Sequence, residues 1–154
     1  MTIVVEIPGE STLELEHLVL DVNGTLTDRG VLIDGVSERL AEISTLLDVH
    51  VLSADTFGTL GSVASELGLQ PQTISTGDDK ARFVAELGAE VCVAIGNGAN
   101  DALMLDSAVI GIAVLGPEGA ASSALAAADV ACASIVDALG LLLDDRALIA
   151  TLRH

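Results

Sequence analysis

Four short segments of the sequence carry residue types that bind a phosphate group or a hard cation. The first, DVNGTLTD (residues 21–28), begins with Asp21, whose carboxylate can serve as a nucleophile or as a metal ligand. Gly24 lets the backbone turn sharply, so that nearby N–H groups can face phosphate oxygens, and Asn23 and Thr25 flank it. Taken alone, such an aspartate would be interpreted as a helix N-cap or a turn residue.

The other three segments supply groups that would complement Asp21. Ser53 and Ala54 lie in the segment LSAD, where a hydroxyl can donate to a phosphate. Lys80 ends the segment GDDK, and its ammonium would neutralise a phosphate and orient a carboxylate. The segment GNGAND (residues 96–101) offers amide and carboxylate oxygens, which suit Mg²⁺. Together the segments predict chemistry on a phosphate group beside a divalent metal.

Hydrophobic periodicity predicts the elements that must position these segments. Alternating runs at residues 3–7 and 12–15 predict an N-terminal β-hairpin. Beyond it, strand-like runs alternate with helical patterns, an order typical of a mainly parallel sheet covered by helices. The predicted strands are residues 18–22, 49–52, 73–75, 91–95, 110–115 and 130–132. The predicted helices are residues 36–47, 59–67, 81–87, 101–105 and 120–127, followed by one or two in the tail 135–152.

This order predicts a three-layer, doubly wound α/β fold in a single domain. The domain would span residues 1–154, with the hairpin at 1–16, the catalytic core at 17–133 and C-terminal helices at 134–154. In such sheets ligands bind outside the carboxyl ends of the strands, which is where all four segments begin or end. His17 and His50 instead stand at strand starts, roughly 10 Å or more from that edge at about 3.3 Å per residue. We therefore do not expect histidine catalysis.

In this order, the motifs resemble the haloacid dehalogenase (HAD) superfamily of aspartyl-phosphate enzymes, and most of all the phosphorylation domain of P-type ATPases. The resemblance lies in DVNGTLT, in VLSADT with its following helix, and in the run AIGNGANDALMLDSAVIGIAVLGPEGAASSALAAADV. It covers nearly the whole chain beyond the hairpin and is closest to the soluble, P-type-ATPase-like branch. The resemblance implies a HAD-type phosphatase that works through a phosphorylated aspartate.

The resemblance also implies roles for individual residues. Asp21 would attack phosphorus and form an acyl phosphate, which water then hydrolyses. The implied catalytic residues are Asp21, Asn23, Ser53 and Lys80. The implied phosphate-binding residues are Asp21, Gly24, Thr25, Ser53, Ala54 and Lys80. The implied Mg²⁺ ligands are the Asp21 carboxylate, the Asn23 backbone carbonyl and the Asn97 side chain, with Asp101 supporting the metal directly or through water.

Two asparagines depart from the pattern of the superfamily. Its phosphatases usually carry a second aspartate, which acts as a general acid and base, where Asn23 stands. An amide cannot do that work, and losing such a group typically lowers a rate by roughly 10²–10⁴-fold. Asn97 also stands where an aspartate is more usual; its oxygen still binds Mg²⁺ but brings no charge, so metal affinity should be weaker. We therefore expect slow turnover.

The spacing of the motifs leaves no room for a cap domain. About thirty residues separate Asp21 from Ser53 and fewer separate Ser53 from Lys80, enough for one helix and its loops. Residues 29–35 could form a small flap. The nucleotide-binding domain of the ATPases would also lie between the first two motifs, and without it ATP is not expected as the specific substrate. The apolar tail fits the interface of a homo-oligomer and packing on its own sheet about equally well.

Composition and charge narrow the partners. The chain has a formal charge of −17, yet 51% of its residues are apolar, which argues for a core and against disorder. An acidic surface repels nucleic acid and anionic membranes, so we expect neither as a partner. The expected partner is a phosphorylated substrate, which the four segments predict. The sequence shows no signal-peptide pattern and no membrane-spanning run, so a cytoplasmic protein is expected. An acidic, lysine-poor surface fits a halophilic source or an ordinary acidic protein from a GC-rich genome.

Several alternatives stay open beside the hydrolase. A non-catalytic phosphate- or metal-binding regulator descended from such enzymes is favoured by the two asparagines and opposed by the retained Asp21, Lys80 and Asp101. A structural subunit would have no reason to keep this set. Asp55 is expected to cap the following helix, and residues 116–119 (GPEG) to form a turn near the rim of the site. The two cysteines are expected to be buried, reduced thiols.

Overall fold

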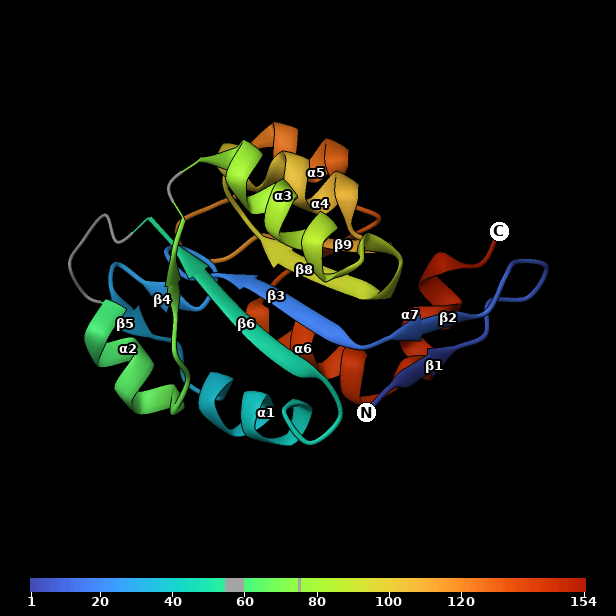
Figure 1. Cartoon of the computed structure of the whole chain (residues 1–154), viewed down its shortest axis with the longest axis horizontal. Coiled ribbons are helices and arrows are strands. Elements are labelled where there is room, and N and C mark those ends of the chain that lie inside the picture. Colours follow the sequence, from blue (N-terminus) through green and yellow to red (C-terminus); the bar gives the residue numbers. More distant parts are fainter. Residues whose placement is uncertain (55–59, 75) are drawn as a thin grey trace.

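A six-stranded parallel sheet forms the centre of the protein, seen here in a computed structural model that describes residues 1–54, 60–74 and 76–154 (Figure 1). The strand order is β10-β9-β8-β3-β6-β7, and neighbouring strands all run parallel. The strands are β3 (His17–Asp21), β6 (Asp48–Ser53), β7 (Gln72–Thr73), β8 (Cys92–Gly96), β9 (Ile110–Val114) and β10 (Val130–Cys132). The predicted α/β sheet is therefore confirmed.

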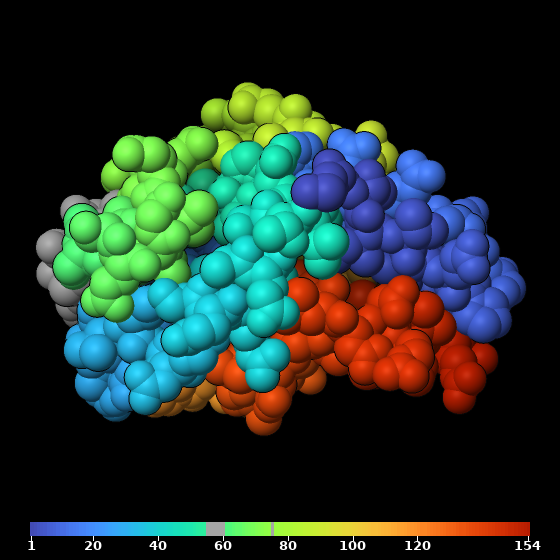
Figure 2. Space-filling model, turned by 90° about the horizontal axis from the view of Figure 1, so that it is seen from below, coloured from blue at the N-terminus to red at the C-terminus, as the bar shows by residue number. Residues whose placement is uncertain are grey.

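Helices cover both faces of this sheet and complete the three predicted layers (Figure 1). One face carries α3 (Gly77–Leu87), α4 (Ala102–Ser107) and α5 (Ser122–Ala127). The other carries α1 (Val36–Ile43), α2 (Leu60–Leu67), α6 (Ile135–Leu143) and α7 (Asp145–Leu152). Figure 2 looks onto this second face, where α1 in blue to cyan and the orange to red C-terminal helices lie side by side. No helix of the described residues is long and apolar enough to cross a membrane.

Side-chain alternation along β3 decides which way Asp21 points. Leu18 and Leu20 belong to the large core cluster that includes residues of α1 and α6, whereas Val19 packs in the second cluster with Val84 of α3. Successive side chains of a strand point to opposite faces of the sheet. Asp21 therefore shares the face of Val19 and is directed toward α3.

Two small antiparallel hairpins accompany the main sheet. The N-terminal one joins β1 (Ile3–Val5) to β2 (Leu13–Leu15), close to α7 (Figure 1). The second joins β4 (Thr27–Asp28) to β5 (Val31–Leu32) and forms the flap expected directly after the Asp21 segment. Single turns of 3₁₀-helix, η1 (Ala89–Val91) and η2 (Ala99–Asp101), precede β8 and α4. The described residues between Asp21 and Lys80 thus hold a hairpin, two helices and two strands, with no cap domain.

Helix boundaries are where the sequence predictions miss. The helix predicted over residues 81–87 begins at Gly77, because the Thr76 hydroxyl accepts the N–H of Asp79 at 3.1 Å and caps it. Lys80, expected to open this helix, therefore lies at the end of its first turn. The helix predicted to reach residue 47 ends at Ile43, where serine and threonine hydroxyls bond back to carbonyls of the last turn. Residue 75 of the weak predicted strand lies outside the described residues.

Candidate active site

The chain turns sharply directly after Asp21, at the carboxyl edge of the sheet. Three backbone N–H groups of this turn fold back onto the carbonyl of Val22 at 2.9 to 3.2 Å. Gly24 has φ 77°, in the left-handed region that favours glycine. A Cβ atom there would also lie 2.5 Å from Nδ2 of Asn97. Glycine at this position therefore allows the turn and lets the Asn97 side chain approach it.

Lys80 joins the first and last segments through two ion pairs. Its Nζ donates to Oδ1 of Asp21 at 2.9 Å and to Oδ1 of Asp101 at 2.8 Å. The side chains of Lys80 and Asp101 are fully buried, and Asp21 is 6% exposed. Two carboxylates thus share one ammonium away from water, an arrangement in which loss of the lysine leaves two buried carboxylates without a cation.

Asp101 has donors on both of its carboxylate oxygens. While Oδ1 accepts from Lys80, Oδ2 accepts the backbone N–H groups of Asn97 at 3.1 Å and Gly98 at 2.9 Å. The carboxylate packs directly over Gly96, where a Cβ atom would lie 2.6 Å from it. Asp101 therefore holds the loop after β8 in place and orients Lys80 at the same time.

Asn97 and Asp21 direct oxygens at one common point, the hydroxyl of Thr25. Thr25 Oγ1 lies 3.0 Å from Oδ1 of Asn97 and 3.3 Å from Oδ2 of Asp21, but a hydroxyl has a single proton to donate. The amide is fixed from its other end, because Nδ2 donates to the carbonyl of Gly119 at 3.0 Å. Converging carboxylate and amide oxygens are the donor set of a hard cation, so these residues fit Mg²⁺.

The acid–base properties of this cluster follow from its burial. Burial raises the pKa of Asp21 from 3.8 to about 7, and the charge of Asp101 adds to the shift, while Lys80 opposes it. Burial alone would lower the pKa of Lys80, but the two carboxylates outweigh it and raise that pKa.

The described residues contain no group of three or more His, Cys, Asp or Glu side chains that could hold a metal. A metal here would depend on Asn97 and on backbone oxygen for its remaining ligands.

The other predicted residues lie close to this cluster in the fold. Ser53 ends β6, the strand beside β3, and is 1% exposed. Its backbone carbonyl accepts the N–H of Ile74 at 2.9 Å, which ties β6 to the segment before α3. Asn23 is half-buried and forms an isolated bridge with Thr27 at the base of the flap. Ala54 is half-buried, and Asp55, the predicted helix cap, lies outside the described residues.

The loop after β9 contributes more to the site than its sequence indicates. The pattern of residues 116–119 predicts a turn near the rim, and Gly119 does hold the amide of Asn97. Glu118 also accepts the backbone N–H of Arg29, at the tip of the flap, at 2.9 Å. Arg29 has φ 48°, which is uncommon for a residue with a side chain. The flap tip is thus linked through one loop to the Asn97 side chain, a contact that sequence spacing does not reveal.

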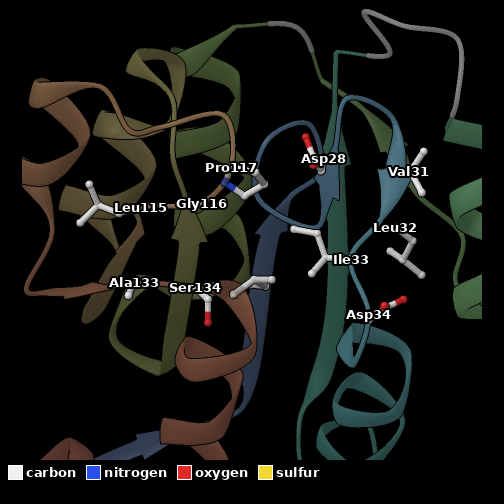
Figure 3. A pocket seen from close by; sticks show the side chains of 11 residues that line it. Asp28, Val31, Leu32, Ile33, Asp34, Leu115, Gly116, Pro117, Ala133 and Ser134 are labelled. Carbon is white, nitrogen blue, oxygen red and sulfur yellow. The ribbon is translucent and has the colours of Figure 1, made fainter.

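A cavity of about 660 Å³ opens between the flap and the loops after β9 and β10 (Figure 3). Its lining is mostly apolar, with two carboxylates at its margin. Figure 3 shows Ile33 and Pro117 from opposite walls pointing across it. None of the predicted catalytic residues lines the cavity, so it lies beside the carboxylate cluster rather than within it. The lining residues are Asp28, Val31, Leu32, Ile33, Asp34, Leu115, Gly116, Pro117, Ala133, Ser134 and Ile135.

The prediction for the cysteines is confirmed, and that for the histidines holds for His17 alone. Cys92 and Cys132 are free and buried, and burial raises the pKa of Cys92 to about 11. His17 begins β3, at the opposite end of that strand from Asp21 as predicted, whereas His50 is the third residue of β6 and pairs in register with Val19.

Comparison with known proteins gives two relatives by sequence, while no family model matches. An uncharacterized protein of Methanocaldococcus jannaschii is 49% identical over 61 residues, which cover 40% of this chain and 66% of that protein. A chloroplastic copper-transporting ATPase of Arabidopsis thaliana is 31% identical over 132 residues, 74% of this chain and 14% of the ATPase. The chain thus spans about two thirds of the first relative and a small part of the second.

Solved structures give similarity over most of the chain. A 3-deoxy-D-manno-octulosonate 8-phosphate phosphatase of Moraxella catarrhalis, in complex with magnesium and phosphate ions and a KDO molecule, has a TM-score of 0.63 and 20% identity, covering 89% of this chain and 92% of that one. A Streptomyces avermitilis protein assigned to the HAD family of hydrolases has a TM-score of 0.66 and 20% identity, covering 83% and 84%.

A zinc-transporting PIB-type ATPase has a TM-score of 0.65 and 26% identity, covering 79% of this chain and 20% of the transporter. The similarity of fold therefore extends to both groups that the motifs resemble. The chain has the α/β fold of the haloacid dehalogenase superfamily, shared with HAD-family hydrolases and with part of a P-type ATPase.

Proposed function

We propose that the protein is a Mg²⁺-dependent phosphohydrolase that transfers a phosphoryl group through Asp21. The observation that carries the proposal is the buried pairing of Lys80 with Asp21 and Asp101 at the carboxyl edge of the sheet. Keeping a lysine fully buried between two carboxylates is costly for stability alone, since an apolar cluster of the same volume would serve as well or better. Buried clusters of ionisable groups with shifted pKa values are instead concentrated at functional sites, where their charges take part in binding or chemistry.

In the first half-reaction, a carboxylate oxygen of Asp21 attacks the phosphorus of a phosphate monoester. A bond forms between that oxygen and phosphorus, the bond to the leaving oxygen breaks, and the product alcohol takes a proton from solvent. Lys80 donates to Oδ1 of Asp21, and its ammonium would stabilise the negative charge of the phosphoryl group. Ser53 and the backbone N–H groups of Gly24 and Ala54 hold the phosphoryl oxygens in this proposal; Thr25 would join them once its N–H leaves the Val22 carbonyl.

In the second half-reaction, water attacks the acyl phosphate. The bond between phosphorus and Asp21 breaks, inorganic phosphate leaves, and the carboxylate is restored. Asn23 stands where a general base would accept the proton of that water, and an amide cannot accept it. The second step is therefore slow, and the phosphorylated form of the protein accumulates.

Bound Mg²⁺ would neutralise phosphate charge and keep Asp21 ionised despite its raised pKa. Asp21, the backbone carbonyl of Asn23 and Asn97 would hold it. Both oxygens of Asp101 already have donors, which favours a role for Asp101 through Lys80, the Asn97 loop or a water molecule over direct ligation. The phosphatase with the similar fold was solved with magnesium and phosphate, which supports this choice of ion.

A regulator that binds phosphate or metal without turnover is the second candidate. The neutral side chains of Asn23 and Asn97 favour it, because they remove the acid–base group and one metal-site charge.

The hydrolase proposal extends to a cytoplasmic location and, from the charge of −17, to an activity optimum at high salt, where screening relieves self-repulsion. The protein would act as one domain over residues 1–154 on an unidentified phosphorylated substrate.

Hydrolysis of a generic aryl phosphate tests the proposal. The rate is measured at low and high salt, with Mg²⁺ or with EDTA, for the wild type, Asp21→Asn and Asp106→Asn. Asp106 is an exposed carboxylate on α4 and serves as the matched control. Activity that needs both Mg²⁺ and Asp21 and survives Asp106→Asn supports the hydrolase. No release of phosphate above background by the wild type would overturn it in favour of the regulator.

A further inference from the structure

Two histidines face each other across adjacent strands, His17 at the start of β3 and His50 on β6 in register with Val19. Nδ1 of His17 on β3 lies 3.2 Å from Nε2 of His50 on β6. The parallel register pairs His17 with Asp48, and the alternation along β6 puts Asp48 and His50 on the same face. Oδ2 of Asp48 lies 3.8 Å from the same nitrogen of His17. Nδ1 of His17 therefore has two further potential metal ligands beside it, one from His50 and one from Asp48.

The spacing of the two nitrogens matches a shared metal ion. Two nitrogens that each lie about 2.05 Å from a tetrahedral Zn²⁺ stand about 3.3 Å apart. A hydrogen bond between two neutral rings also fits 3.2 Å, but it requires only one lone pair and one proton. Which of the two arrangements the pair adopts then depends on the surrounding charge and on access from solvent.

The surroundings favour a cation. Glu16 precedes His17 in the chain, and Glu90 lies near Cys92, which pairs in register with His17; the charges of both glutamates act on the Cys92 thiol. Together with Asp48 they place negative charge around the pair.

Access and rigidity also suit an ion. The side chain of His17 is 16% exposed and that of Asp48 is 77% exposed, so an ion can enter from solvent. His50 is held from behind by the ring of Phe83 on α3, at 5.4 Å between ring centres in an edge-to-face arrangement. One imidazole is thus fixed in place, while the carboxylate beside the pair is free to rotate.

We propose that His17 and His50 bind one imidazole-preferring divalent ion of the Zn²⁺ class. Asp48 rotates to become the third ligand, and water completes the coordination. The described residues contain no group of three such side chains already placed to hold an ion, so the proposal requires the Asp48 side chain to move. The ion ties the start of β3 to β6 and stabilises the sheet at a distance from the phosphate chemistry. The site is independent of the proposed reaction at Asp21.

Zn²⁺ titration by calorimetry in excess Mg²⁺ tests the site, because Mg²⁺ occupies oxygen ligands and leaves imidazole free. The variants are His17→Gln, His50→Gln and Asp48→Asn, with His154→Gln as the matched histidine control. His154 is exposed and pairs with Glu10 near the C-terminus. We expect one Zn²⁺ bound by the wild type and by His154→Gln, no saturable binding by the other two histidine variants, and affinity reduced about tenfold or more in Asp48→Asn.

A second readout on the wild type avoids the risk that a variant fails to fold. Imidazole ¹⁵N resonances are recorded as Zn²⁺ is added. We expect Nδ1 of His17 and Nε2 of His50 to shift together at one equivalent, while His154 stays unchanged. Shifts confined to His154, no shift of either ring of the pair, or undiminished binding by folded His17→Gln or His50→Gln would each overturn the proposal.

Discussion

Nζ of Lys80 lies 2.9 Å from Oδ1 of Asp21, and the two residues stand 59 positions apart in the chain. The fully buried lysine side chain also reaches Asp101, so two carboxylates share a single cation. This relationship couples the stability of the protein to the charges of its candidate active site, and it makes the site accessible to stability measurements as well as to kinetics.

Lys80→Met should destabilise the protein strongly. Removing the ammonium leaves two buried carboxylates without a cation, a change that typically costs about 3–5 kcal/mol. The free energy of unfolding from urea titration at pH 7 measures the cost. Adding Asp101→Asn to Lys80→Met should recover part of it, because one uncompensated charge is removed. A cost below about 1 kcal/mol would show that the pairing does not hold the charges as described.

The stability of the metal-free protein should depend on pH through Asp21. Its pKa is about 7 in the folded state, against 3.8 for an aspartate in an unfolded chain, so the folded state binds more protons between these values. The contribution of Asp21 to stability is therefore lost as pH rises from about 4 to about 7. Relative to the wild type, Asp21→Asn should gain stability between pH 5 and pH 8, on the order of a few kcal/mol.

Urea titrations in EDTA at both pH values measure this difference, with Asp106→Asn as the exposed control. Changes from the histidines and other groups are common to all three proteins and cancel in the comparison. A difference between Asp21→Asn and the wild type that stays constant from pH 5 to pH 8 would contradict the raised pKa of Asp21.

Asn23→Asp should speed turnover. An aspartate at this position restores a group that can give a proton to the leaving oxygen and accept one from water, an effect of roughly 10²–10⁴-fold in typical cases. Steady-state release of phosphate from an aryl phosphate measures it, with Asn23→Ala as the control for loss of the amide. An equal rate in Asn23→Asp and the wild type would mean that Asn23 does not limit the reaction.

Asn97→Asp should tighten binding of Mg²⁺. The change adds a negative charge to the oxygens that face Thr25, and a charged ligand should raise affinity on the order of tenfold. It also removes the hydrogen bond from Nδ2 to Gly119, so the metal-free variant should be less stable. Calorimetric titration with Mg²⁺ at fixed salt compares the two proteins. Weaker binding by the variant would place the ion away from Asn97.

The sequence predicts which residues come together at the candidate site better than it predicts the contacts between them. Asp21, Ser53 and Asn97 can be placed at one edge because parallel strands bring their carboxyl ends together. The position of Lys80 relative to Asp21 cannot be derived in the same way, because it depends on the packing of α3 against β3. The first turn of α3 is missed as well, since glycine and aspartate in GDDK are typical of loops while the cap at Thr76 decides the boundary.

Contacts between distant loops are the least predictable. Glu118 holds the flap at Arg29, 89 positions away, and nothing in its local pattern indicates this. The pairing of His17 with His50 likewise depends on β3 and β6 being neighbours in a given register. Periodicity identifies strands and their faces, but the order and register of strands are set by packing of the whole chain.

Trapping the phosphorylated protein tests the central claim most directly. The wild type is mixed with an aryl phosphate and Mg²⁺, quenched, and reduced with borohydride, and the modified residue is located by peptide mass spectrometry. Since the second step is slow in this account, we expect a reduced acyl phosphate at Asp21, absent in EDTA and absent in Asp21→Asn. Turnover without modification of Asp21, or turnover that persists in Asp21→Asn, would contradict phosphoryl transfer through this residue.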